Sequence, residues 1–204
     1  MTIKATIWDF SGVLIQPIFP DPYKQLADEL YIPADWLTKY FDGTENYRLD
    51  RGTESEQAYL RRMICGLGLK ESAIPVLENF FFGKFKLDQE LITFIRQSRP
   101  KMKTALCSNF SDRLRPAINE QWKISDAFDA IIISCEVGHV KPEPVIYQAT
   151  LDQLQLNPED AVFIDDQEKN VKGAQAIGMR AILFNNTLQT IAEINACSNL
   201  KTTI

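Results

Sequence analysis

The chain has 204 residues and a formal net charge of −5, with 45% hydrophobic and 24% charged residues. This composition is ordinary for a globular protein, and the length allows one sizeable core with a small inserted subdomain. The acidic balance gives no reason to expect a nucleic acid or an anionic membrane as a partner. The sequence has no apolar run of membrane-spanning length and no signal-peptide pattern at its N-terminus. We therefore expect a cytoplasmic protein whose four cysteines are reduced, and the sequence does not indicate an oligomeric state.

Apolar segments of strand length occur at residues 3–8, 103–108, 130–134, 161–165 and 180–184. Helical patterns separate the later segments: Ser111 can cap one helix, Pro142 can open a second, and Gly178 can end a third that covers residues 170–177. Strands that alternate with helices pair in parallel, and continuous apolar runs suit strands that are covered on both faces. The pattern predicts an α/β fold with a Rossmann-like parallel sheet.

A long helical insertion interrupts this rhythm after the first strand. Helical patterns cover residues 21–31 and 34–41, and the capping box at residues 53–56 precedes a further amphipathic helix. A helix that begins at Asp88 returns to the core layer. We therefore assign residues 1–15 and 85–204 to an α/β core and residues 16–84 to a helical cap. An insertion at the carboxyl end of a strand lies above the crevice where such sheets bind ligands, so we expect it to act as a lid.

Polar residues gather at the predicted strand ends. They are Asp9, Ser108, Asn109, Lys141, Asp165 and Asp166. Because the carboxyl ends of parallel strands share one edge of the sheet, we expect these side chains to converge. Three carboxylates in one place repel each other unless a cation neutralises them, and an all-oxygen ligand set favours Mg²⁺. The lysine, the serine and the asparagine are donors that suit an anionic group.

These residues also carry a resemblance to a known family. The matching segments are Asp9-Phe10-Ser11-Gly12-Val13, Ser108-Asn109, Lys141-Pro142 and Asp165-Asp166. In order and spacing they resemble the four motifs of the haloacid dehalogenase-like (HAD) hydrolase superfamily, in the branch of subfamily I that has a helical cap. The resemblance implies the strand order 5-4-1-2-3.

The resemblance also implies roles for individual residues. Asp9 would attack phosphorus and form an aspartyl-phosphate, and Lys141 would offset the negative charge. Phosphoryl oxygens would be bound by Ser108, Asn109 and Lys141. Mg²⁺ would be held by Asp9, Asp165, Asp166 and the backbone carbonyl of Ser11.

The sequence departs from the family pattern at Ser11, where most of the family's phosphatases have a second aspartate for general acid–base catalysis. Three functions therefore stay open. The leading hypothesis is a Mg²⁺-dependent phosphatase of a small phosphorylated metabolite. The second is a metal-free 2-haloacid dehalogenase in which Asp9 attacks carbon, although the acidic pair Asp165-Asp166 is unusual for that subfamily. The third is a phosphate-binding or partner-binding module without turnover.

Overall fold

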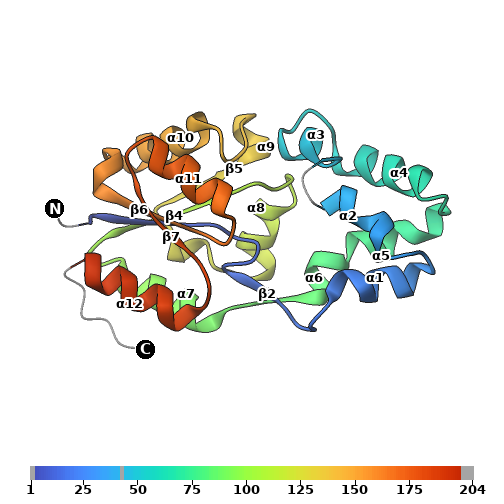
Figure 1. The fold of residues 1–204 in the computed structure, drawn as a ribbon, viewed down its shortest axis with the longest axis horizontal. Helices are drawn as coiled ribbons and strands as arrows, with labels where there is room; N and C mark the ends of the chain where they lie inside the picture. Colours follow the sequence, from blue (N-terminus) through green and yellow to red (C-terminus); the bar gives the residue numbers. More distant parts are fainter. Residues whose placement is uncertain (1–2, 42–43, 199–204) are drawn as a thin grey trace.

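The computed structural model describes residues 3–41 and 44–198 and is built on a sheet of five parallel strands (Figure 1). The strands are β1 (Ala5–Trp8), β4 (Lys103–Ser108), β5 (Ala130–Ile133), β6 (Ala161–Asp165) and β7 (Arg180–Leu183). Their order across the sheet is β5-β4-β1-β6-β7. Numbered one to five along the chain, the same strands read 5-4-1-2-3 from the β7 edge. The predicted strand order is therefore confirmed.

Helices cover both faces of the sheet, as the continuous apolar runs predict. The covering helices are α7 (Gln89–Ser98) and α12 (Thr187–Cys197) on one face, and α10 (Pro144–Leu154) and α11 (Glu168–Ala176) on the other. Successive residues of a strand point to opposite faces. In β6, Val162 and Ile164 pack on the side of α7 and α12, whereas Phe163 packs on the side of α10. The central strand β1 is fully buried.

Three predicted helix starts differ from the structure. The segment after β4 begins as the single turn α8 (Leu114–Pro116) and continues as a π-helical stretch (Ala117–Gln121), without a side-chain cap from Ser111. The helical segment runs through Pro116, which lies in its first turn, where the missing N–H of proline is tolerated. The next helix, α10, begins at Pro144 rather than at Pro142, and α11 begins at Glu168.

A second group of helices lies beyond one end of the sheet, and we call it the cap helices. They are α1 (Pro22–Leu30), α2 (Asp35–Phe41), α3 (Tyr47–Asp50), α4 (Glu56–Gly66), α5 (Ile74–Glu78) and α6 (Phe80–Lys84). They bury an apolar cluster of their own, centred on Leu26, Leu37 and Met63. The residue that caps α4 is Ser55, whose hydroxyl accepts from the N–H of Ala58 at 3.3 Å. The predicted capping box, which starts at Thr53, is therefore wrong about the capping residue.

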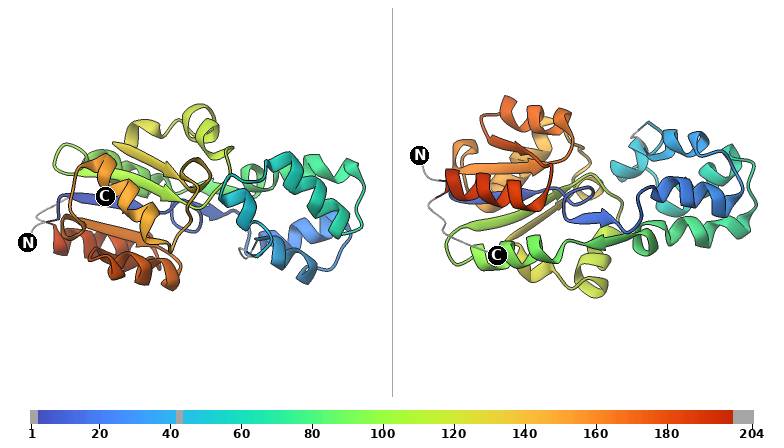
Figure 2. Two further views of the ribbon diagram at one scale, coloured as in Figure 1. Left: turned by 90° about the horizontal axis from the view of Figure 1, so that it is seen from above. Right: turned by 60° about the horizontal axis from the view of Figure 1, so that its bottom comes forward.

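A short antiparallel ribbon joins the cap helices to the sheet (Figures 1 and 2). It consists of β2 (Ile15–Pro17) and β3 (Phe85–Leu87), which the sequence analysis missed because three-residue strands carry little periodicity. The remaining short elements are α9 (Ser134–Val137) and 3₁₀ turns at Glu71–Ala73, Ser125–Ala127 and Pro158–Asp160. The boundaries proposed for the cap, residues 16–84, stay a prediction. In the described part of the chain, no helix combines the length and the apolar character needed to cross a membrane.

Candidate active site

Three carboxylates meet where β1 and β6 end. Asp9 follows β1, and its backbone N–H donates to the carbonyl of Ile164 at 2.9 Å, which sets it beside the last residue of β6, Asp165. One oxygen each from Asp9, Asp165 and Asp166 lies within 4.8 Å of the others. Asp9 and Asp165 are buried, and Asp166 is exposed. The donor set is all carboxylate, so these residues fit a hard divalent cation such as Mg²⁺.

Lys141 neutralises two of these carboxylates. Its ammonium nitrogen is 2.6 Å from Oδ1 of Asp9 and 2.7 Å from Oδ2 of Asp165, and all three side chains are almost completely buried. Burial alone would lower the pKa of Lys141, but the two carboxylates raise it above its ordinary value, so the ammonium stays charged. The lysine that the sequence leaves in a loop therefore stands at the centre of the site.

The protonation state of Asp9, the candidate nucleophile, depends on its burial and on the charged groups around it. Burial raises the pKa of Asp9, and the Asp165 and Asp166 carboxylates add to the rise, while Lys141 opposes it. The N–H of Phe10 also donates to Oδ1 of Asp9, at 2.6 Å. A second cation near Asp9 and Asp166 would favour the ionised carboxylate that a nucleophile requires.

Ser108, the last residue of β4, and Asn109, the next residue, lie at the strand end but have different surroundings. Ser108 is completely buried, and its hydroxyl has no hydrogen-bond partner within the described part of the chain. An unpartnered buried hydroxyl is uncommon and suits a ligand oxygen. The amide side chain of Asn109 instead braces the lysine loop: its Oδ1 accepts from the N–H of Lys141 at 2.7 Å, and its Nδ2 donates to the carbonyl of Lys141 at 3.0 Å.

Asn170 is a site residue that the sequence analysis missed. Its side-chain amide donates to Oδ1 and Oδ2 of Asp165, at 3.0 and 3.1 Å, from the first turns of α11. The N–H of Gln167 donates to Oδ1 of Asp165 as well, at 2.8 Å. These hydrogen bonds fix the orientation of Asp165. Residues around a metal ligand commonly orient it in this way. The only signal in the sequence is the position of Asn170, five residues after the acidic pair.

Gly12 allows Asp166 to approach the first loop. A Cβ atom at this position would lie 2.3 Å from Oδ2 of Asp166, and the backbone of Gly12 has φ +81°, a conformation that favours glycine. The neighbouring Ser11 lines the cavity described below. The first loop is thus shaped so that Ser11 and Asp166 face the same space.

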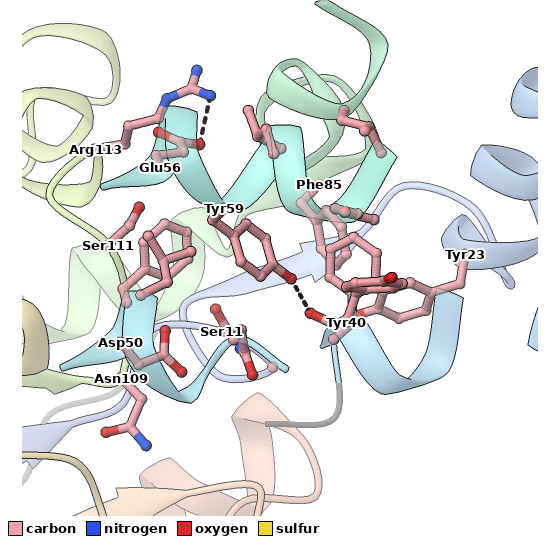
Figure 3. A pocket seen from close by; sticks show the side chains of 18 of the residues that line it. Ser11, Tyr23, Tyr40, Asp50, Glu56, Tyr59, Phe85, Asn109, Ser111 and Arg113 are labelled. Carbon is pink, nitrogen blue, oxygen red and sulfur yellow. Dashed lines mark hydrogen bonds and ion pairs between the residues drawn. The ribbon is translucent and has the colours of Figure 1, made fainter. Parts of the chain in front are cut away.

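A cavity of about 530 Å³ lies between the core and the cap helices (Figure 3). This volume falls within the range that small-molecule sites occupy. Its core wall includes Ser11, Asn109 and Asp166, and its cap wall includes Tyr40, Asp50 and Tyr59. The carboxylate of Asp50 points into this space in the direction of Ser11. The sequence analysis did not single out Asp50.

Two arginines tie the cap helices to the core. Arg51 donates to the carbonyl of Gly138 at 3.1 Å and forms an ion pair with Glu143, on the loop that carries Lys141. Arg113 of the core donates to the carboxylate of Glu56, at 3.0 Å, and to the carbonyl of Glu78, at 2.8 Å. Arg51 therefore holds the cap on the core, and its guanidinium carbon lies 4.8 Å from the centre of the Tyr47 ring.

Several known proteins are similar to this chain over most of its length. The chain is 26% identical over 215 residues to bifunctional epoxide hydrolase 2 of Mus musculus, a match that covers 95% of the chain and 38% of that protein. It is 24% identical over 208 residues to D-ribitol-5-phosphate phosphatase of Bacteroides thetaiotaomicron, covering 97% of the chain and 99% of the relative. The chain thus spans about two fifths of the epoxide hydrolases that it matches.

A similar solved structure is a HAD family enzyme of Bacteroides thetaiotaomicron in complex with magnesium and inorganic phosphate. It has a TM-score of 0.77 and 20% identity, and the match covers 93% of this chain and 98% of that one. The family model for haloacid dehalogenase-like hydrolases matches residues 3–178. Because this match covers most of the sequence, the chain belongs to the haloacid dehalogenase-like hydrolases.

Proposed function

We propose that the chain is a Mg²⁺-dependent phosphatase that acts on a small phosphorylated metabolite through an aspartyl-phosphate on Asp9. The observation that carries the proposal is the meeting of Asp9, Asp165 and Asp166 beside Lys141, at the edge of a cavity that admits a small molecule. Two features of the relatives support it: one is a sugar-alcohol phosphatase, and one solved structure holds magnesium and phosphate.

In this proposal the core residues divide the chemistry among them. A carboxylate oxygen of Asp9 attacks phosphorus, the bond from phosphorus to the leaving oxygen breaks, and water later cleaves the aspartyl-phosphate. Lys141 offsets charge on Asp9 and on the transferring group. Ser108, with its unpartnered hydroxyl, and Asn109 bind phosphoryl oxygens. Mg²⁺ would be held by Asp9, Asp165, Asp166 and the carbonyl of Ser11, where it would neutralise the negative charge of the phosphoryl group.

The alternatives make different demands on the same residues. A metal-free dehalogenase would use Asp9 to attack carbon and would have no need of Asp166, whose approach the chain accommodates with Gly12. A binding module without turnover would need no buried ion pair between the nucleophile candidate and Lys141.

The proposal is tested by phosphate release from a panel of phosphorylated sugars, sugar alcohols and hydroxy acids, with Mg²⁺ or with EDTA, beside a halide-release assay on 2-haloacids. We expect Mg²⁺-dependent phosphate release that the Asp9→Asn variant abolishes. Asp28→Asn is the matched control, because Asp28 lies exposed on α1 and pairs with the neighbouring Lys24. Halide release, or phosphate release that survives in Asp9→Asn, would contradict the proposal.

A further inference from the structure

The phosphatase reaction needs a proton donor, and each carboxylate of the core site already has another task. A leaving alkoxide must be protonated, and the water that attacks the aspartyl-phosphate must lose a proton. In the function proposed above, Asp9 is the nucleophile and Asp166 faces the metal. Asp165 accepts hydrogen bonds from Lys141, Asn170 and the N–H of Gln167. The hydroxyl of Ser11 is too weak an acid to serve at neutral pH.

The carboxylates on the cap side of the cavity are not equivalent. Glu56 is paired with Arg113 at 3.0 Å, and Glu78 lies at the same end of the cavity, where its carbonyl accepts from Arg113. The carboxylate of Asp50 has no hydrogen-bond or ion-pair partner among residues 3–41 and 44–198, and it points into the cavity toward Ser11 (Figure 3). Asp50 is therefore a carboxylic acid whose proton is not committed elsewhere.

We propose that Asp50 is the general acid and general base of this phosphatase, an inference that rests on the function proposed above. In the first step Asp9 bonds to phosphorus, the bond to the leaving oxygen breaks, and the carboxylic acid of Asp50 gives its proton to that oxygen. In the second step the Asp50 carboxylate takes a proton from water, whose oxygen bonds to phosphorus while the bond to Asp9 breaks. Inorganic phosphate leaves, and both aspartates return to their initial states.

The direction of the reaction places Asp50 on the correct side. In phosphoryl transfer the attacking and leaving oxygens lie roughly in line on opposite sides of phosphorus. Asp9 approaches from the sheet edge, so the leaving oxygen faces the cap helices. The attacking water of the second step enters where the leaving group departed. A single carboxyl group on the cap wall can therefore serve both steps.

Neighbouring contacts fix Asp50 over the core. The next residue, Arg51, is bonded to Gly138 and Glu143 on the loop of Lys141. A Cβ atom on Gly52 would lie 2.2 Å from the carbonyl oxygen of Cys135, so the turn after Asp50 packs directly on core backbone. General acid–base catalysis requires such positioning, since the proton must be within hydrogen-bond reach in the reacting complex.

The electrostatic surroundings suit a group that must both give and take a proton. Burial raises the pKa of Asp50 to about 7, while the charges of Lys141 and Lys169 oppose the rise. The charge of Asp50 in turn helps to raise the pKa values of Tyr59 and Cys135. A pKa near the working pH keeps both protonation states available.

The test compares Asp50→Asn with the wild type on an alkyl phosphate that the wild type hydrolyses and on 4-nitrophenyl phosphate, whose departing oxygen needs little protonation. Measured at saturating Mg²⁺, kcat/KM reports the first step. We expect Asp50→Asn to lower kcat/KM about 100-fold or more on the alkyl phosphate and less than about tenfold on the aryl phosphate, because general acid catalysis contributes roughly 10²–10⁴-fold.

The second step gives an independent readout. Without a general base the aspartyl-phosphate should persist, so Asp50→Asn should release 4-nitrophenol in a burst equal to the enzyme concentration and then turn over slowly. Mass spectrometry should find the phosphoryl group on Asp9. The matched control is Asp28→Asn, which changes an exposed carboxylate of the cap helices outside the cavity, and it should keep the wild-type ratio of the two kcat/KM values and show no burst.

The outcomes separate the two proposals. A wild type that releases no phosphate refutes the proposed function itself. An active wild type whose Asp50→Asn variant loses kcat/KM equally on both substrates, or loses none and shows no burst, refutes the role of Asp50. An equal loss on both substrates would instead mark Asp50 as a binding residue.

Discussion

Replacing Lys141 with methionine should lower the free energy of unfolding, because it leaves two buried carboxylates without their cation. The ammonium of Lys141 lies 2.6 Å from Asp9 and 2.7 Å from Asp165, and the three side chains are only 1%, 6% and 0% exposed. Removing one partner of a buried ion pair leaves an uncompensated charge and costs about 3–5 kcal/mol. Total stabilities are about 5–15 kcal/mol, so this change should remove a large fraction of the free energy of unfolding. For a chain of this size the melting temperature should fall by roughly 6–20 °C.

The assay is urea unfolding at neutral pH in EDTA, so that no metal ion replaces the missing ammonium. Lys172→Met is the matched control, because Lys172 forms an exposed pair with Glu168 that should contribute little to stability. The penalty of Lys141→Met should shrink in an Asp9→Asn background, since one of the two carboxylates is then neutral. If Lys141→Met were as stable as Lys172→Met in EDTA, the argument from buried charge would be refuted.

The penalty should also depend on pH with a definite sign. Without the opposing ammonium, the pKa of Asp9 in the folded state should rise further above that of the unfolded chain. A folded state with a raised carboxyl pKa binds more protons than the unfolded state, so its stability falls as pH rises through that interval. The deficit of Lys141→Met should therefore be largest at neutral and higher pH and should diminish as the solution is acidified.

Two further predictions concern the first loop and the cap. Gly12→Ala places a Cβ 2.3 Å from Asp166 and should remove the rise in melting temperature on adding Mg²⁺, whereas Gly68→Ala, with a similar φ of +66° and nothing within 4 Å, should keep that rise. An equal Mg²⁺ response in both variants would separate Asp166 from the metal. Arg51→Met removes charged hydrogen bonds of about 1.5–3 kcal/mol each between cap and core, so kcat/KM should fall about tenfold or more. Arg96→Met, which breaks an exposed pair within the core, should leave kcat/KM unchanged, and equal values for the two arginine variants would refute the docking role.

The site residues at the strand ends could be predicted from the lengths of the apolar runs and from the way parallel strands align. Buried runs end at Asp9 and Asp165, and parallel strands bring their carboxyl ends to one edge, so the meeting of these carboxylates follows from the fold class. Lys141 is different, because it follows a short helix in a loop and no local pattern aims its side chain. Its assignment required the resemblance to a family.

The hydrogen bonds that orient the site could not be predicted, since they depend on where side chains point after the core has packed. The side-chain amide of Asn109 forms two hydrogen bonds with the backbone of Lys141, which the position of Asn109 after β4 does not reveal. Asn170 reads as an ordinary helical residue and holds Asp165. An asparagine has two donors and an acceptor, and the sequence does not say which neighbour will satisfy them.

Asp50 was missed for a related reason. It ends the four-residue helix α3, which is too short to show an apolar stripe, and a charged residue in such a segment is usually interpreted as solvent-exposed. Its position depends on contacts that are distant in sequence, where Arg51 reaches Glu143 and Gly52 packs against Cys135. Only the docking of the cap on the core brings Asp50 into the cavity.

The candidate site is divided between the core and the cap helices, so both proposed proton transfers depend on how the cap is docked. The core carries the nucleophile candidate, the lysine and the metal-binding carboxylates, and Asp50 belongs to the cap helices. With the cap displaced, Asp9 would lose its proton donor while Lys141 and the carboxylates kept their arrangement. Docking through Arg51 and Arg113 would then be a condition for both proton transfers, because the acid and base is positioned only when the cap is closed.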